Sequence, residues 1–377
     1  MSPSDVVVVG GSTAGATVLQ ELRSRGYEGR LTLLDPEPGT NRPPLSKAVL
    51  ADAAAEDSVL MDHSSLDVEL VRARATGLDH AARTVATDDG HTHRFDALVV
   101  ATGSRARCIA APGQTGELVL RTVEDARRVR ERFADATTAV VVGAGFLGLE
   151  VATAAVTAGL RVTVVDVAPP LQRLLGDHLA TAICERATTL GIDFRRSGAV
   201  LMGDPVRGVR LDDGEELAAD VVVSCVGDEP VTDWLHGAGL ETDHGVVIDD
   251  HARTNLADVY AAGDVAAIRT PEGVVRRPFW ANAVAHGRVA AAAVLGQPVD
   301  TPIVDDYFWS EIAGVSLKVV GSLPVDGAPE VLEDAGSGHG LLAWGQSTVV
   351  AYGIRRSAPR LRAVLRERAS SAVSNAD

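Results

Sequence analysis

Residues 139–150 read Ala-Val-Val-Val-Gly-Ala-Gly-Phe-Leu-Gly-Leu-Glu, a β-branched run followed by the spacing Gly-x-Gly-x-x-Gly. A continuous run of this kind is typical of a parallel strand that is covered on both faces. The glycines let a turn tighten, and they let the backbone approach a pyrophosphate at the N-terminus of the next helix. We predict that this helix runs to Ala158 and stops at Gly159, and that a second strand then ends at Asp166. Such a βαβ unit binds a dinucleotide.

The same plan stands at the N-terminus of the chain. Strand-like Val6–Val9 leads into Gly-Gly-Ser-Thr-Ala-Gly at 10–15, then a helix that stops at Gly26 and a strand that ends at Asp35. Ser12 replaces the second glycine of the spacing, and either its hydroxyl bonds a phosphate oxygen or it is only a small spacer. One copy of the pattern is a weak signal. Two copies in matched context predict two dinucleotide sites.

Three more strands run into glycine, at 96–103, 220–227 and 259–264, and we expect Asp264 to open a helix. Another helix is predicted over 280–295, strands with alternating polarity near 316–320 and 348–352, and a last helix from Pro359 to about Ser370. The order predicts an α/β fold with two Rossmann-like domains, one inserted in the other, and a small C-terminal α+β domain. The expected domains are 1–108 with 237–300, then 109–236, then 301–377.

Composition excludes several classes of protein. The net charge is −16, so general nucleic-acid binding is not expected. Cys108, Cys184 and Cys225 are far apart in the sequence, which argues against a disulfide scaffold, a Cys-x-x-Cys pair and a thiolate metal site. We predict no metal. The sequence shows neither a signal peptide nor a long apolar run, so we expect a cytoplasmic protein with no membrane contact.

Beyond the glycine turns, several motifs follow one another in an order that resembles a known family. The chain is similar to the FAD-dependent NADH:ferredoxin reductases of oxygenase systems, the family of putidaredoxin reductase, rubredoxin reductase and the biphenyl dioxygenase reductase component. The implied fold is glutathione-reductase-like. The motifs are Arg42-Pro-Pro-Leu-Ser-Lys47, Ala101-Thr-Gly103, Gly143-Ala-Gly-Phe-Leu-Gly-Leu-Glu150, Tyr260-Ala-Ala-Gly-Asp-Val-Ala266, Trp280-x-Asn-Ala283 and Phe308-Trp-Ser-Glu311.

The resemblance implies FAD in the first site and NADH in the second. It implies that a hydride passes from NADH to flavin N5, and that single electrons then pass to a [2Fe–2S] ferredoxin supplying a cytochrome P450 or a dioxygenase. Two alternatives are a rubredoxin-type reductase and a flavin- and NADH-binding regulator that resembles apoptosis-inducing factor. A dithiol or peroxide reductase is disfavoured, because residues 41–47 hold no cysteine.

Two of the predicted site residues have catalytic roles by resemblance. By this resemblance, Lys47 tunes the redox potential of the flavin. Glu150 lies with it at the nicotinamide-facing side of the flavin, where both residues orient rather than cleave. Either Asp35 or Glu37 is expected to bind the ribose of FAD. Asp166 predicts NADH rather than NADPH, because an acid at the strand end repels a 2′-phosphate; Arg173 instead favours NADPH. The full set of predicted cofactor contacts is Gly10, Ser12, Ala14, Gly15, Asp35, Glu37, Arg42, Lys47, Ala101, Thr102, Gly103, Gly143, Gly145, Phe146, Leu147, Glu150, Asp166, Gly227, Gly263, Asp264, Trp280, Ala281 and Trp309.

The acceptor surface is predicted from aromatic and basic residues. Trp280 and Trp309 match tryptophans near the acceptor-facing flavin edge, although core packing also explains them. The arginine-rich segment Arg355–Arg368 either docks an acidic ferredoxin or is a solvated helix face. The sequence is compatible with either a monomer or a homodimer. The chain departs from the family pattern at Asn41, Val231 and His286, the last standing where glutamine is common.

Overall fold

The computed structural model describes residues 3–299 and 301–373. Contacts divide the chain into two compact units, each made of several segments. Unit 1 comprises Met1–Pro43, Glu56–Arg105 and Asp228–Asp305; unit 2 comprises Pro44–Ala55, Ala106–Gly227 and Asp306–Asp377. The three-domain division expected from the sequence stays a prediction.

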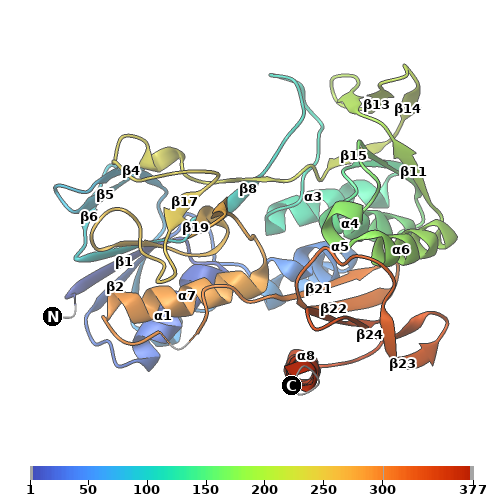
Figure 1. The fold of residues 1–377 in the computed structure, drawn as a ribbon. Helices are drawn as coiled ribbons and strands as arrows, with labels where there is room; N and C mark the ends of the chain where they lie inside the picture. The colour runs from blue at the N-terminus through green and yellow to red at the C-terminus, as the bar shows by residue number, and fades with distance from the viewer. Residues whose placement is uncertain (1–2, 300, 374–377) are drawn as a thin grey trace. The chain divides into compact units, whose positions relative to one another are not determined.

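Unit 1 is built on a five-stranded sheet in the order β18-β7-β1-β2-β3, with parallel pairing throughout. The strands are β1 (Asp5–Val9), β2 (Arg30–Leu34), β3 (Val68–Val71), β7 (Ala97–Val100) and β18 (Val259–Ala261). Helices α1 (Thr13–Ser24) and α7 (Trp280–Val294) lie side by side (Figure 1). The valines of β1 are buried, as a strand covered on both faces requires.

Two smaller sheets complete unit 1. One is an antiparallel meander of β4 (Ala75–Asp79), β5 (Thr84–Thr87) and β6 (Thr92–Arg94), and the other joins β17 (Val246–Ile248), β19 (Ala266–Thr270) and β20 (Gly273–Val275). The expectation that Asp264 opens a helix is wrong. It lies in a single 3₁₀ turn, η6 (Gly263–Val265), because the apolar residues that follow enter β19 and pair with β17.

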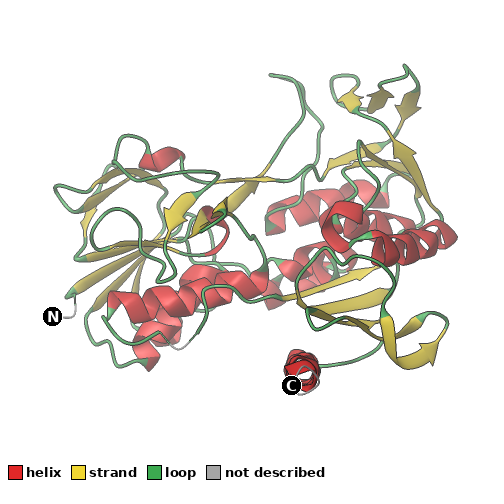
Figure 2. Ribbon diagram, viewed as in Figure 1, coloured by secondary structure: helices red, strands yellow, loops and turns green. Residues whose placement is uncertain are grey.

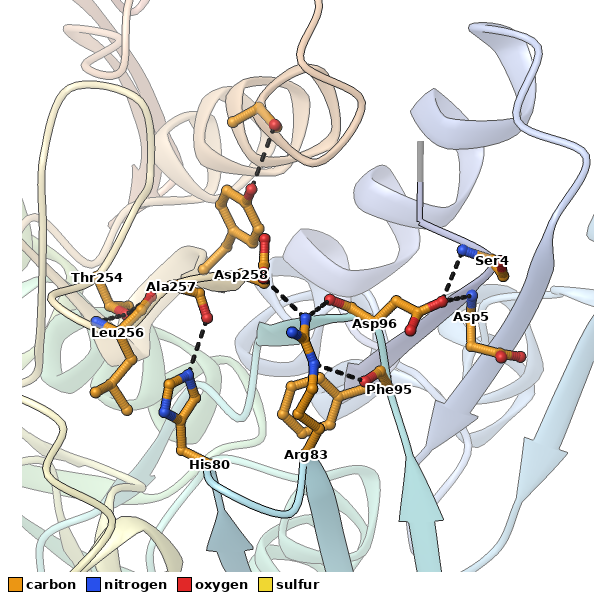
Figure 3. A network of polar contacts seen from close by, with 12 residues as sticks. Ser4, Asp5, His80, Arg83, Phe95, Asp96, Thr254, Leu256, Ala257 and Asp258 are labelled. Carbon is orange, nitrogen blue, oxygen red and sulfur yellow. Dashed lines mark hydrogen bonds and ion pairs between the residues drawn. The ribbon is translucent and has the colours of Figure 1, made fainter. Parts of the chain in front are cut away.

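A polar network ties the meander to the parallel sheet (Figure 3). The guanidinium of Arg83 donates to the carbonyl oxygens of Phe95 and Asp96 and, at 2.8 Å, to the carboxylate of Asp258. The carboxylate of Asp96 accepts from the amides of Ser4 and Asp5 at 2.8 and 3.1 Å. These bonds hold the first residues of β1 against the strand that closes the βαβ unit.

Unit 2 repeats the plan with a four-stranded parallel sheet in the order β11-β10-β9-β15. Its strands are β9 (Thr138–Val142), β10 (Arg161–Asp166), β11 (Ile192–Arg196) and β15 (Val221–Ser224), and its helices are α2 (Ala48–Ala51), α3 (Val123–Ala134), α4 (Phe146–Thr157), α5 (Gln172–Leu175) and α6 (Asp177–Leu190). A small antiparallel sheet holds β12 (Ala199–Leu201), β13 (Gly208–Leu211) and β14 (Glu216–Ala218). The two short strands where the chain crosses between units are β8 (Ser104–Ala106) and β16 (Asp228–Pro230).

The predicted helix stops are confirmed in both copies. Helix α1 ends at Ser24 and α4 at Thr157, and Gly26 and Gly159 follow with φ of 83° and 94°. Glycine adopts this left-handed conformation without the steric cost that a Cβ brings.

The C-terminal part of unit 2 is an antiparallel sheet in the order β21-β22-β25-β24-β23, followed by α8 (Ala358–Val373) (Figure 2). The strands are β21 (Tyr307–Ile312), β22 (Val315–Gly321), β23 (Glu330–Gly336), β24 (His339–Trp344) and β25 (Thr348–Tyr352). The expected strand over 348–352 is present, but every residue of β25 is buried, because α8 packs against β22 and β25. The α/β class and the C-terminal α+β segment are confirmed. Among the described residues, no helix is long and apolar enough to cross a bilayer.

Candidate functional site

The first glycine turn brings β1, β7 and α1 into close contact. Gly10 has a φ of 102°, and a Cβ atom there would lie 2.3 Å from the carbonyl oxygen of Ala101. A Cβ atom at Gly15 would lie 1.8 Å from the carbonyl oxygen of Gly10. Only glycine permits both approaches, so the turn and the start of α1 are held close together.

The second turn has the same construction. A Cβ atom at Gly143 would meet the carbonyl oxygen of Cys225 at 2.3 Å, and one at Gly148 would meet that of Gly143 at 1.9 Å. Gly145 differs, because a Cβ atom there would meet only a Leu174 methyl at 3.9 Å. Protein packing therefore does not require glycine at 145. A closely approaching ligand such as a pyrophosphate would require glycine there.

Both helices that follow the glycine turns begin without a cap. Neither α1 nor α4 has a side-chain hydrogen bond at its N-cap or an acidic residue in its first turn. By contrast, Thr122 and Asp125 close the N-terminus of α3 with a capping box. The amides at the starts of α1 and α4 thus lack side-chain acceptors among the described residues, and they suit the phosphates of a dinucleotide.

Asp35, at the end of β2, faces the first glycine turn. Its carboxylate accepts from the amide of Gly11 at 2.6 Å and from the amide of Glu37 at 3.1 Å. The Glu37 side chain itself is exposed. The choice between Asp35 and Glu37 as the ribose ligand stays a prediction.

Asp166, at the end of β10, makes the matching contacts in the second copy. Its carboxylate accepts from the amide of Ala144 at 2.7 Å and from that of Ala168 at 2.9 Å. Each strand-end aspartate therefore holds its own glycine turn. A carboxylate has about four lone-pair sites, so both aspartates can also accept from a ribose hydroxyl.

Ser12, at the start of α1, has an extended backbone conformation, and its hydroxyl oxygen accepts from the amide of Thr40 at 3.2 Å. This bond leaves the hydroxyl proton of Ser12 to donate elsewhere. Both expectations for Ser12, phosphate ligand and small spacer, stay predictions.

Asp264 lies next to the first glycine turn. The preceding residue, Gly263, is so close to α1 that a Cβ atom there would lie 2.7 Å from the Cβ of Ala14. The predicted FAD residues 101–103 follow β7, where the Thr102 hydroxyl donates to the carbonyl oxygen of Val231 at 2.8 Å. The turn η6, the end of β7 and the start of α1 thus meet in unit 1, in an arrangement that fits one dinucleotide.

In unit 2, Glu150 gathers three hydrogen-bond donors although its side chain is only 8% exposed. Oε1 lies 2.8 Å from the Lys47 ammonium and accepts from the Ser310 hydroxyl at 2.6 Å. Oε2 accepts from the Ser46 hydroxyl at 2.5 Å. A buried carboxylate needs such compensation, because desolvating an ion costs several kcal/mol, on the order of the whole stability of some domains.

One aromatic ring contacts this ion pair, and two others pack together from the same elements, α4 and β21. The Lys47 ammonium lies 4.9 Å from the centre of the Trp309 ring, within range of a cation–π interaction. The rings of Phe146 and Phe308 are 4.2 Å apart. The structure therefore brings together Lys47, Glu150 and Trp309, three of the residues singled out from the sequence.

Sequence reasoning missed Ser46 and Ser310. Each directly adjoins a residue that it did select, Lys47 or Trp309. That adjacency was the available signal, but nothing local indicates that both hydroxyls reach one carboxylate.

The remaining residues predicted to contact a cofactor differ in their burial and their contacts. Trp280 belongs to unit 1, is 43% exposed and donates from its indole to the side chain of Asn41 at 3.1 Å. Arg42 and Leu147 are half-buried and Ala281 is buried. Gly227 is exposed, with φ of 102°. Their roles at a cofactor stay predictions.

The cysteines near the second site are poor nucleophiles. Burial, assisted by the negative charge of Glu150, raises the pKa of Cys225 to about 12. Burial alone raises the pKa of Cys184 to about 11. Since the thiolate is the reactive form, both thiols are almost fully protonated and inert near neutral pH.

Part of the C-terminal arginine segment is already neutralised. Arg356 pairs with Glu333, Arg368 pairs with Glu330 at 2.5 Å, and Arg362 lies over the ring of Tyr307. The exposed arginines of the segment are Arg355, Arg360 and Arg366. The net positive charge offered to a partner is therefore smaller than the sequence suggests.

Comparisons with known proteins show the family and the fold. A model of the pyridine nucleotide-disulphide oxidoreductase family matches residues 4–287. The chain is 37% identical to the ferredoxin reductase component of chlorobenzene dioxygenase from Cupriavidus sp. (strain PS12), covering 89% of this chain and 85% of that protein. It is 32% identical to a rubredoxin-NAD(+) reductase of Pseudomonas putida, covering 84% and 86%. A crystal structure of the covalent putidaredoxin reductase–putidaredoxin complex matches with a TM-score of 0.86 and 27% identity, covering 98% and 94%.

Proposed function

The chain belongs to the pyridine nucleotide-disulphide oxidoreductase family, and on that basis we propose that it is an NADH-dependent flavoprotein that delivers electrons to a [2Fe–2S] ferredoxin. The resemblance to the ferredoxin reductases of oxygenase systems is confirmed by relatives that cover most of both chains. The enzyme class, an oxidoreductase that uses FAD and NAD(H), is confirmed with it.

Each cofactor has a set of residues that fits it. The start of α1, with Ser12, Asp35 and Asp264, would hold FAD; the start of α4, with Gly145 and Asp166, would hold NADH. When bound, the flavin supplies a ring that accepts electrons as a pair and releases them singly. The protein supplies binding, orientation and a fixed charge.

The observation that carries the proposal is the Lys47–Glu150 pair. A single ammonium is held against a buried carboxylate and an indole ring, so its position is fixed before any ligand arrives. A fixed positive charge stabilises an anionic reduced flavin without reorganisation. Ser46 and Ser310 hold the carboxylate in place, and we propose that Lys47 tunes the flavin rather than reacting.

The family name includes disulphide reductases, but residues 41–47 and two of the three thiols of this chain argue against that chemistry. Residues 41–47 contain no cysteine, and the pKa values of Cys184 and Cys225 are raised to about 11 and about 12 by burial. A one-electron protein acceptor needs no thiol. This supports a ferredoxin rather than a disulfide as the oxidant.

A second acceptor is favoured by a specific relative, the rubredoxin-NAD(+) reductase. Rubredoxin and ferredoxin are both small one-electron carriers, and the site described above does not distinguish them. We propose that the exposed Arg355, Arg360 and Arg366 of unit 2 dock the partner. Trp280 in unit 1 and Trp309 in unit 2 stay separate candidates for residues near the acceptor. We propose that a downstream oxygenase consumes the electrons. We also propose that the protein is cytoplasmic.

The test is reconstitution followed by turnover. The purified chain should be yellow, or should become so with added FAD, and should then oxidise NADH rapidly with ferricyanide and reduce a [2Fe–2S] ferredoxin. Faster reduction of rubredoxin than of ferredoxin would select the second acceptor. Flavin binding without turnover would instead support the regulator that resembles apoptosis-inducing factor, and a protein that binds no flavin would refute both.

A further inference from the structure

We infer that Arg276 is a positioning residue for Asp264, fixing the turn η6 against the start of α1 so that this turn can receive a dinucleotide. The inference rests on the proposed binding of FAD in unit 1. Nothing in the sequence singles out Arg276, which lies in the loop after β20.

Arg276 makes a two-point contact with one carboxylate and a third contact with the turn. Its two terminal nitrogens lie 2.8 and 2.6 Å from the two oxygens of Asp228. One of them also donates to the carbonyl oxygen of Asp264 at 3.1 Å. The side chains of Arg276 and Asp228 are only 14% and 25% exposed. A bidentate pair of this kind fixes the plane of the guanidinium, and so the direction of its third bond.

His286 holds the same turn at the residue before. Its Nδ1 accepts from the amide of Gly263 at 3.2 Å, and the side chain is 1% exposed. Burial lowers the pKa of His286 to about 4, so the ring is neutral and Nδ1 remains an acceptor at neutral pH. The turn is thus held at Gly263 by an acceptor on α7 and at Asp264 by a donor after β20.

The turn has little room to move without disturbing the dinucleotide site. Gly263 packs against Ala14, the second residue of α1, where a Cβ atom on the glycine would lie 2.7 Å from the alanine Cβ. A displacement of Asp264 therefore changes its position relative to the amides at the start of α1. Because Arg276 acts through the turn, removing it should weaken FAD binding without altering the glycine turn itself.

A nearby arginine provides the matched control. Arg105 also pairs with two carboxylates of unit 1, Glu229 and Asp233, but its side chain is 50% exposed. Glu229 directly follows Asp228, so both ion pairs are anchored on the same strand, β16, and its continuation. If loss of the Arg105 ion pair weakened FAD binding as much as loss of the Arg276 ion pair, the role of Arg276 would be only structural.

The experiment compares Arg276→Gln with Arg105→Gln by titrating FAD into each apoprotein and following flavin fluorescence. We expect the Kd for FAD to rise about tenfold in Arg276→Gln, since a charge-assisted hydrogen bond contributes roughly that factor, and to change less than about twofold in Arg105→Gln. The Kd for NADH, measured by nicotinamide fluorescence, should be unchanged in both. Asp228→Asn, which keeps the shape of the partner but removes its charge, should weaken FAD binding in the same direction and serves if Arg276→Gln does not fold.

The outcomes separate the two levels of the proposal. Wild-type apoprotein that does not bind FAD would overturn the proposed function together with this inference. Wild-type binding with an unchanged Kd in Arg276→Gln, or an equal rise in Arg105→Gln, would overturn the positioning role alone and leave the flavoprotein assignment standing.

Discussion

Glu150 shows what one buried charge requires of its neighbours. Its carboxylate receives an ammonium from Lys47 and hydroxyls from Ser46 and Ser310, with donor–acceptor distances of 2.5 to 2.8 Å. If one partner of such a pair is removed, the other charge is left buried without compensation. The pair is therefore expected to matter for stability as well as for electron transfer.

Replacing Lys47 with methionine should lower the free energy of unfolding by about 3 kcal/mol, the low end for a broken buried pair, because the ammonium is partly exposed. Urea denaturation of the apoprotein would measure the change. The chain's other lysine provides the control: Lys318 donates to the carbonyl oxygen of Arg356, so Lys318→Met should cost less. A double-mutant cycle with Glu150→Gln should show strong coupling to Lys47, and additive effects would contradict the ion-pair account.

The two strand-end aspartates allow a paired test of cofactor assignment. Asp166→Ala should raise the KM for NADH about tenfold through loss of ribose contacts while leaving FAD retention unchanged. Asp35→Ala should do the reverse, weakening FAD binding with little effect on the KM for NADH. Steady-state kinetics and FAD titration would measure both quantities. Equal effects of the two variants on both cofactors would mean that each aspartate serves only its glycine turn.

At the scale of elements, the two βαβ units share a hydrogen-bond pattern at the starts of their strands as well as at their glycine turns. The carboxylate of Asp96 accepts from the amides of residues 4 and 5, and that of Asp220 accepts from the amides and hydroxyls of Thr137 and Thr138. Each aspartate precedes the closing strand and holds the first strand of its own sheet. These hydrogen bonds lower the pKa of Asp220 to about 2.

The lowered pKa of Asp220 predicts a pH-dependent contribution to stability. Because the ionised form is favoured in the folded state, its contribution is complete above the ordinary pKa of about 4 and is lost as pH falls toward about 2. Asp220→Asn should therefore lower the Tm at pH 7, and the difference from wild type should shrink between pH 4 and 2. Asp193→Asn, at an exposed position on β11, controls for the loss of one surface carboxylate. A difference that persists at pH 2 would argue against this linkage.

At the scale of the whole molecule, function depends on a surface that a separate protein must find. The chain has a net charge of −16, so an acidic carrier is repelled except where positive charge is concentrated. Because Arg356 and Arg368 are paired with glutamates, only part of the C-terminal segment remains for the proposed docking.

Reversing Arg355, Arg360 and Arg366 to glutamate should lower the ferredoxin-dependent rate several-fold, more at low salt, because steering charges act mainly on association. The ferricyanide-dependent rate should stay within about twofold of wild type, because the small acceptor does not need this docking surface. Reversal of Arg74, Arg94 and Arg253, three exposed arginines of unit 1, changes the net charge equally and serves as the control. Equal losses in both triple variants would assign the effect to net charge rather than to docking.

The repeated βαβ plan could be predicted because its causes are local. Valine runs favour buried parallel strands, and Gly26 and Gly159 supply the positive φ just after α1 and α4. One prediction failed because segments outside the local pattern intervene. Asp264 lies in a short turn instead of opening a helix, because the residues after it pair with β17.

The sequence alone determined the two dinucleotide units and the ends of their helices, since each depends on residue order within about thirty positions of the chain. The order of the motifs along the whole chain indicated the family. Tertiary structure alone decided which side chains meet. Ser46 and Ser310 lie 104 and 160 positions from the carboxylate that they share, and Arg276 lies 48 positions from Asp228. Convergence over such separations is set by how the elements pack, which no local pattern of residues encodes.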